Sequence, residues 1–305
     1  MRRYFDRPAK RALIGVGDDC ALLRPDAGFE LAVTTDMLVE GRHFLPGADP
    51  GALGHKALAV NLSDLAAMGA APRWATLSLA LPGADEAWLA AFSQGFFALA
   101  GRYGVDLVGG DTTRAQLLTI SVTALGEVPS GLALYRAGAK AGDDIWVSGE
   151  LGGAALALVH PEIAAAAQRL HRPEPRVELG ERLRGLAHAA IDVSDGLTGD
   201  LQHILARSGV GATVSYAQVP RAGAFGQLGN ARLEKDCVLS GGDDYELLFT
   251  VPADRRSDVE ALSRELKIPL SRIGSVIRGE PRLAVLDENG RPLPYRGGFD
   301  HFAAG

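Results

Sequence analysis

Residues 117–124 read LLTISVTA, and the alternation in this stretch decides the fold class. Leu118, Ile120 and Val122 alternate with small hydroxyl residues, which is the period of a strand with one buried face. Residues 74–81, WATLSLAL, alternate in the same way. Both stretches are therefore predicted to be strands of a sheet that is covered on one side.

Helical stretches neighbour these strands along the chain. Residues 52–69 and 85–102 are longer than a strand, rich in alanine and leucine, and bounded by turn residues, so both are predicted to be helices. The periodicity then stops at 136–144, RAGAKAGDD, before the strand-like IWVS. We place a domain boundary there, which gives predicted domains at 1–137 and 138–305.

The second half repeats this style, so we expect two α/β domains of the α+β type. Residues 220–232 have weak periodicity and are expected to form a loop. The predicted helices lie near 151–160, 175–187, 197–207 and 254–266, and the predicted strands near 189–193, 211–216, 245–251, 270–276 and 282–286.

Composition excludes several classes of protein. In 305 residues, hydrophobic residues make up 47% and charged residues 22%, which is ordinary globular usage. The net charge of −6 provides no basic field for a nucleic acid or an anionic membrane, so neither is an expected partner. No apolar run approaches the ~18 residues of a membrane span. Cys20 and Cys237 form neither a disulfide framework nor a zinc-ligand pattern, and a cytoplasmic protein is predicted.

Aspartates recur beside glycine or hydroxyl residues, where the pattern predicts that strands end. They are Asp18 and Asp19 in GVGDDCA, Asp36 in LAVTTD, Asp111 in LVGGDTT, Asp192 and Asp195 in IDVSDG, and Asp243 and Asp244 in GGDDYE. Asp64 lies instead within an apolar helix, one turn after Asn61. Each aspartate alone also fits an ordinary role as a turn former, a helix cap or a solvated side chain. As a set, they predict carboxylates that gather at the carboxyl ends of strands.

Gathered carboxylates repel one another unless a cation lies among them, and oxygen ligands favour Mg²⁺ with nucleotide phosphates. The sequence contains neither a P-loop GxxxxGK[ST] nor a GxGxxG fingerprint, so another phosphate site is required. Phosphoryl transfer also needs positive charge, for which Arg114 and Arg136 are candidates. A solvated linker arginine is the ordinary alternative for Arg136.

Six motifs in this order and spacing resemble the thiamine-monophosphate kinase family: GVGDDCALL, TTDMLVEGRHF, ALAVNLSDLAAMGA, LVGGDTTR, DVSDGL and GGDDYELLF. The resemblance extends from RYFDR at 3–7 to GFDHF at 298–302. It implies the fold of aminoimidazole ribonucleotide synthetase and selenophosphate synthetase, and transfer of the γ-phosphoryl group of ATP to thiamine monophosphate. It further implies a homodimer in which the N-terminal sheets pair into a barrel-like interface and helices cover the C-terminal sheet.

The resemblance also implies roles for individual residues. Asp36, Asp64, Asp111 and Asp195 are expected to be catalytic. The implied metal ligands are Asp19, Thr34, Thr35, Asp36, Asp64, Asp111, Asp192 and Asp195. The implied ATP contacts are Tyr103, Gly110, Asp111, Arg136 and Ser194, and the implied thiamine phosphate contacts are His43, Asp243 and Phe299. Asp243 is one methylene shorter than the glutamate that is usual in the family.

The acceptor is a phosphate oxygen that is already ionised at neutral pH, so we expect direct transfer without a general base or a phospho-enzyme. Three alternatives remain open from the residues. They are another synthetase of the same fold, which makes an acyl phosphate or selenophosphate, a metal-dependent phosphatase or nuclease, and a binding protein with structural calcium.

Overall fold

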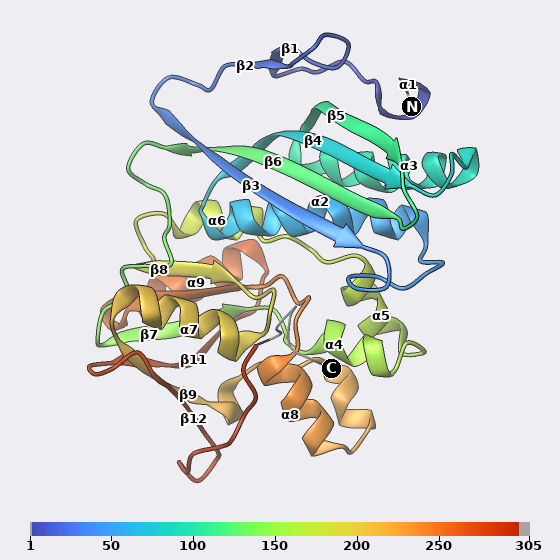
Figure 1. Ribbon diagram of the computed structural model, residues 1–305. Coiled ribbons are helices and arrows are strands. Elements are labelled where there is room, and N and C mark those ends of the chain that lie inside the picture. Colours follow the sequence, from blue (N-terminus) through green and yellow to red (C-terminus); the bar gives the residue numbers. More distant parts are fainter. Residues whose placement is uncertain (1, 299–305) are drawn as a thin grey trace. The chain divides into compact units, whose positions relative to one another are not determined.

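The computed structural model describes residues 2–298, and the chain divides into two compact units (Figure 1). The first unit comprises the residues up to 65 together with 70–133. The second comprises 66–69 and the chain from 134 onward. Each unit contains its own sheet, which confirms the predicted fold class of two mixed α/β domains.

The first unit is built on a four-stranded sheet in the order β3-β6-β4-β5. The strands are β3 (Phe29–Val39), β4 (Ala71–Leu81), β5 (Asp106–Arg114) and β6 (Thr119–Pro129). β6 is antiparallel to both β3 and β4, whereas β4 and β5 are parallel. The chain begins with a short helix and a small antiparallel pair, namely α1 (Arg2–Phe5), β1 (Ala12–Ile14) and β2 (Leu22–Leu23).

Two helices, α2 (Pro50–Ala67) and α3 (Glu86–Tyr103), lie on one side of this sheet (Figure 1). Their apolar residues form the core of the unit, with Leu58, Leu62, Phe92 and Phe96 fully buried. The Asp85 carboxylate caps α3 by accepting from the backbone N–H groups of its first turn. The apolar and polar residues of β6 therefore alternate because one face of the strand packs against the helices and the other face points away from them.

The second unit is built on a six-stranded sheet in the order β12-β9-β11-β7-β10-β8. Neighbouring strands are antiparallel except β12 and β9, which are parallel. The strands are β7 (Asp143–Ser148), β8 (Ala189–Asp192), β9 (Gly211–Ser215), β10 (Leu247–Pro252), β11 (Leu270–Ile277) and β12 (Leu283–Leu286).

Helices cover this sheet, as expected: α7 contacts β8 and β12, and α9 contacts β11. Leu201, Ile204 and Leu205 of α7 are fully buried in the core. The helices are α4 (Gly153–Val159), α5 (Ala164–His171), α6 (Val177–Leu183), α7 (Leu197–Ser208), α8 (Ala231–Ser240) and α9 (Arg256–Leu266), with 3-10 turns at Tyr216–Gln218, Gly223–Gln227 and Ala253–Arg255.

Two local expectations were wrong. The predicted loop at 220–232 contains the 3-10 turn Gly223–Gln227 and the start of α8. Asp36 and Asp111 do not follow strands but lie within β3 and β5, because both strands continue past the aspartate. Within residues 2–298, every helix is too short or too polar to cross a bilayer.

Candidate functional site

In the first unit, Asp36 of β3 lies close enough to Asp64 of α2 for their charges to interact. The hydroxyl of Thr34 donates to the Asp64 carboxylate, and the backbone N–H of Asp36 donates to Asn61 Oδ1 over 3.2 Å. Asn61 is buried and its amide group donates to the carbonyl of Ala57, which fixes the direction of Oδ1. The spacing of Asn61 and Asp64, one turn apart, thus places both side chains of α2 against β3.

The electrostatics of this pair favour a cation. Burial, and then the charge of Asp64, raise the pKa of Asp36 to about 7. An ionised carboxylate at this position is therefore costly unless positive charge is supplied. Thr34 shares this side of β3, but Thr35 lies on the opposite face, where its hydroxyl is 2.8 Å from that of Thr123. The two threonines consequently do not present their hydroxyls to the same place.

A second group of predicted residues lines a pocket of about 240 Å³ beside β5. Asp18, Asp19, Gly110 and Asp111 all border it. Gly110 has φ of 149°, and a Cβ there would lie 1.9 Å from the Leu77 carbonyl oxygen, so only glycine fits. The pocket thus joins the GVGDDCA and LVGGDTT motifs, which are about ninety residues apart in the chain.

Two other predicted residues of the first unit lie just after β3 and at the end of α3. His43 follows β3, and its Nδ1 accepts from the backbone N–H of Val39 over 3.0 Å. This hydrogen bond fixes the tautomer and the ring orientation. Tyr103 is the last residue of α3, with the Arg102 guanidinium 5.2 Å from the centre of its ring.

In the second unit, the IDVSDG segment wraps around a carboxylate that the sequence reasoning missed. Asp192 ends β8 and is buried. Beyond it, the backbone N–H groups of Ser194, Asp195 and Gly196 all donate to Asp200 Oδ2 over 3.1 Å. Burial and the charge of Asp195 raise the pKa of Asp200 to about 7, against these hydrogen bonds. Its place four residues after Gly196, in the first turn of α7, was the available signal.

The segment from Gly241 to Glu246 follows α8 and lies beside the IDVSDG segment. The backbone N–H of Asp243 donates to the Ser194 carbonyl over 2.9 Å, and that of Tyr245 donates to the Val193 carbonyl over 2.8 Å. The predicted substrate residue Asp243 and the predicted nucleotide residue Ser194 are thus neighbours.

Two further contacts that the family implies are Arg136 and Phe299. Arg136 is exposed, and its carbonyl accepts from the Ser208 hydroxyl over 3.4 Å. Phe299 lies outside the described residues.

Asp244, next to Asp243, makes the stability of the protein depend on pH. Burial raises its pKa from 3.8 to about 8, although the N–H groups of Gly152 and Ala154 act in the opposite direction. Between these two pH values the folded chain retains a proton that the unfolded chain has lost, so this contribution to stability falls as pH rises. We expect urea unfolding at pH 5 and pH 8 to show a smaller pH dependence for Asp244→Asn than for the wild type. An equal dependence in both would contradict the assignment.

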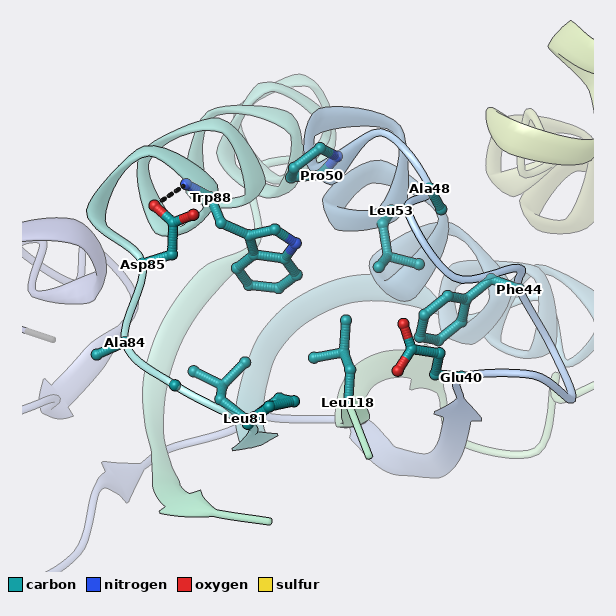
Figure 2. A pocket seen from close by; sticks show the side chains of 13 residues that line it. Glu40, Phe44, Ala48, Pro50, Leu53, Leu81, Ala84, Asp85, Trp88 and Leu118 are labelled. Carbon is teal, nitrogen blue, oxygen red and sulfur yellow. Dashed lines mark hydrogen bonds between the residues drawn. The ribbon is translucent and has the colours of Figure 1, made fainter. Parts of the chain in front are cut away.

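Figure 2 shows a further pocket of the first unit, with a volume of about 580 Å³. The side chains of Phe44, Leu53, Leu81, Trp88 and Leu118 give it an apolar wall, and Glu40 adds one carboxylate beside Phe44. None of its lining residues belongs to the predicted site, although Phe44 directly follows His43. This hollow and the predicted site therefore do not coincide.

The donor chemistry of the first unit fits Mg²⁺. Among residues 2–298, no three His, Cys, Asp or Glu side chains lie close enough to enclose a metal ion. Mg²⁺ does not require such a cage, because it commonly binds one or two carboxylates and completes its shell with water and substrate phosphates. The Asp36 and Asp64 pair meets that requirement, and burial together with the charge of Asp64 raises the pKa of Asp36.

The chain matches two domain families along its length. Residues 17–128 match the family described as AIR synthase related protein, N-terminal domain, and residues 140–285 match the corresponding C-terminal domain. Thiamine-monophosphate kinase of Salmonella typhimurium is 45% identical over 99% of this chain and 97% of its own length. The Haemophilus influenzae enzyme is 40% identical over 99% of this chain and 96% of its own length.

Solved structures agree with these matches. The crystal structure of thiamine-monophosphate kinase from Stenotrophomonas maltophilia is 49% identical, covers 93% of each chain and superposes with a TM-score of 0.86. A structure described as AaThiL complexed with AMPPCP and TMP is 33% identical, covers 94% of this chain and 92% of its own, and has a TM-score of 0.79. The chain belongs to the thiamine-monophosphate kinase family.

Proposed function

We propose that the protein transfers the γ-phosphoryl group of ATP to thiamine monophosphate, giving thiamine diphosphate. The observation that carries this proposal is the match to thiamine-monophosphate kinases over 99% of the chain. The structure of a relative at 33% identity is described as a complex with AMPPCP and TMP. AMPPCP is an analogue of ATP, and TMP is the usual abbreviation of the proposed acceptor. The neighbouring carboxylates Asp36 and Asp64 suit such chemistry, since they would hold Mg²⁺, which would neutralise the negative charge of the phosphates.

In the first unit, we assign metal binding to Asp19, Thr34, Asp36, Asp64 and Asp111, and we retain Thr35 only as implied by the family. Tyr103 and Gly110 are assigned to ATP, and His43 to thiamine monophosphate. In the second unit, we assign Asp192 and Asp195 to metal, Ser194 and Arg136 to ATP, and Asp243 to thiamine monophosphate. Phe299, which lies outside the described residues, keeps the thiamine monophosphate contact that the family implies. In the proposed domains 1–137 and 138–305, Arg136 falls in the first domain, although it belongs to the second compact unit.

The mechanism follows from the charge of the reactants. The acceptor oxygen is ionised at neutral pH, so the residues need not remove a proton from it. The task of the chain is to hold two anionic phosphates in line, and Arg136 is assigned to the donor. Mg²⁺, when bound, supplies neutralising charge to the phosphates. We therefore propose direct transfer without a phosphorylated protein intermediate.

The test is incubation of the purified protein with ATP, Mg²⁺ and thiamine monophosphate, followed by chromatography of thiamine diphosphate. We expect product only when acceptor and Mg²⁺ are both present, and inversion at a chiral γ-phosphorus. Inorganic phosphate released at the same rate without acceptor would instead indicate a phosphatase. Consumption of ATP without thiamine diphosphate would indicate another synthetase of this fold. Stable phosphate on the protein would contradict direct transfer.

We also propose that the active form is a homodimer. On the side of the sheet away from the helices, alternate residues of β3 expose apolar side chains: Leu31 is 41% exposed, Val33 59% and Met37 55%. Exposed apolar side chains on one face of a strand are suited to burial against a second copy. Light scattering at micromolar concentration should give twice the chain mass, and Val33→Asp should lower it to the chain mass. A monomeric wild type would contradict the proposal.

A cytoplasmic location remains a prediction from the sequence.

A further inference from the structure

The segment that carries Asp243 has an unusual backbone. Asp243 has φ of 68° and Tyr245 has φ of 51°, both in the left-handed region that non-glycine residues rarely adopt. Two such residues separated by one position cost conformational energy, which the surroundings must offset. The bend returns the side chain of Tyr245 toward Asp243, and the Tyr245 hydroxyl donates to Asp243 Oδ1 over 2.9 Å.

Buried polar contacts hold this bend in place. The Asp244 carboxylate accepts from the backbone N–H of Gly152 over 2.7 Å. Glu246, only 1% exposed, accepts from the Arg176 guanidinium through both carboxylate oxygens at 2.6 Å and from the Ser148 hydroxyl at 2.6 Å. Arg169 adds a further contact to Glu246 at 3.0 Å. Residues on both sides of Tyr245 are therefore anchored, and the strained conformation is built into the fold.

From this geometry we infer that Tyr245 is a positioning residue, whose hydroxyl fixes the direction of the Asp243 carboxylate for binding of thiamine monophosphate. The inference rests on the proposed function, in which Asp243 contacts the acceptor. Tyr245 is buried, at 9% exposure, so packing around the side chain holds its hydroxyl in one position. A carboxylate aimed in advance loses less rotamer entropy when substrate binds.

Tyr245→Phe tests this role because it removes one oxygen and keeps the ring. Loss of one hydrogen bond to a charged group should raise the KM for thiamine monophosphate about tenfold. The KM for ATP should change less than twofold, and the thermal midpoint should stay near that of the wild type. The matched control is Tyr216→Phe, which removes a hydroxyl that donates to Glu234 over 3.2 Å in the same unit. The control should leave both KM values unchanged.

A double-mutant cycle identifies the partner of the hydroxyl. In the Asp243→Ala background, Tyr245→Phe should have no further effect on thiamine monophosphate binding, measured by calorimetry so that no turnover is needed. A full tenfold effect in that background, an unchanged KM in Tyr245→Phe, or equal rises for ATP and acceptor would each overturn the inference. If the wild type does not bind thiamine monophosphate, the proposed function fails with it. If it binds and Tyr245→Phe binds equally well, only the positioning role fails.

Discussion

Asp36→Asn is expected to lower the rate of thiamine diphosphate formation by about 10²–10³-fold, the usual cost of removing one electrostatic contact to a transition state. The substitution keeps the shape of the side chain and removes its charge. The variant therefore removes one of the carboxylates assigned to the metal, whose neighbour Asp64 raises the pKa of Asp36. The rate is measured with saturating ATP and thiamine monophosphate over a series of Mg²⁺ concentrations.

Asp26→Asn is the matched control, since Asp26 is an exposed aspartate before β3 in the same unit. It should retain the wild-type rate. A binding measurement separates loss of the site from loss of the fold. Mg²⁺ with an ATP analogue should raise the thermal midpoint of the wild type and of Asp26→Asn by similar amounts, and that of Asp36→Asn by a smaller amount. Wild-type turnover by Asp36→Asn would remove Asp36 from the proposed site.

The sequence predicted the elements with strong periodicity and those between clear turn signals. β4, β6, α2 and α3 lie within a few residues of their predicted positions, because alternation and helical length are local properties. The placement of Asp64 next to Asn61 on a helix was also predictable from spacing alone. The thiamine-monophosphate kinase family followed from linked motifs, and the comparisons confirm it.

Other features depend on contacts between distant segments. The position of Asp36 within β3 was not predicted, since the strand is stabilised over eleven residues by pairing with β6. Asp200 looks like an ordinary helix residue, and only the fold brings three backbone N–H groups to its carboxylate. The left-handed conformations of Asp243 and Tyr245 are likewise invisible in sequence, because both residues usually adopt φ below zero.

The packing of the first unit includes a close approach of α2 to α3. The two helices approach at glycines: a Cβ on Gly95 would lie 1.8 Å from the Gly51 carbonyl oxygen, and one on Gly54 would lie 2.1 Å from that of Phe92. Both obstacles are backbone atoms, which cannot move without moving a helix. The same α2 carries Asn61 and Asp64 to β3, so the position of this helix also sets the position of the candidate site.

Gly95→Ala is therefore expected to destabilise the protein by about 3 kcal/mol or more, at the upper end of overpacking costs, as measured by urea unfolding. Gly101→Ala is the matched control, because Gly101 lies in the same helix and a Cβ there would have no neighbour within 4 Å. Alanine's higher helix propensity should make that variant more stable by about 0.5–1 kcal/mol. The two substitutions add the same methyl group to the same helix. Opposite changes in the free energy of unfolding would therefore show that the loss of stability in Gly95→Ala comes from the contact with α2. If both variants gained stability, the close approach of the helices would be refuted.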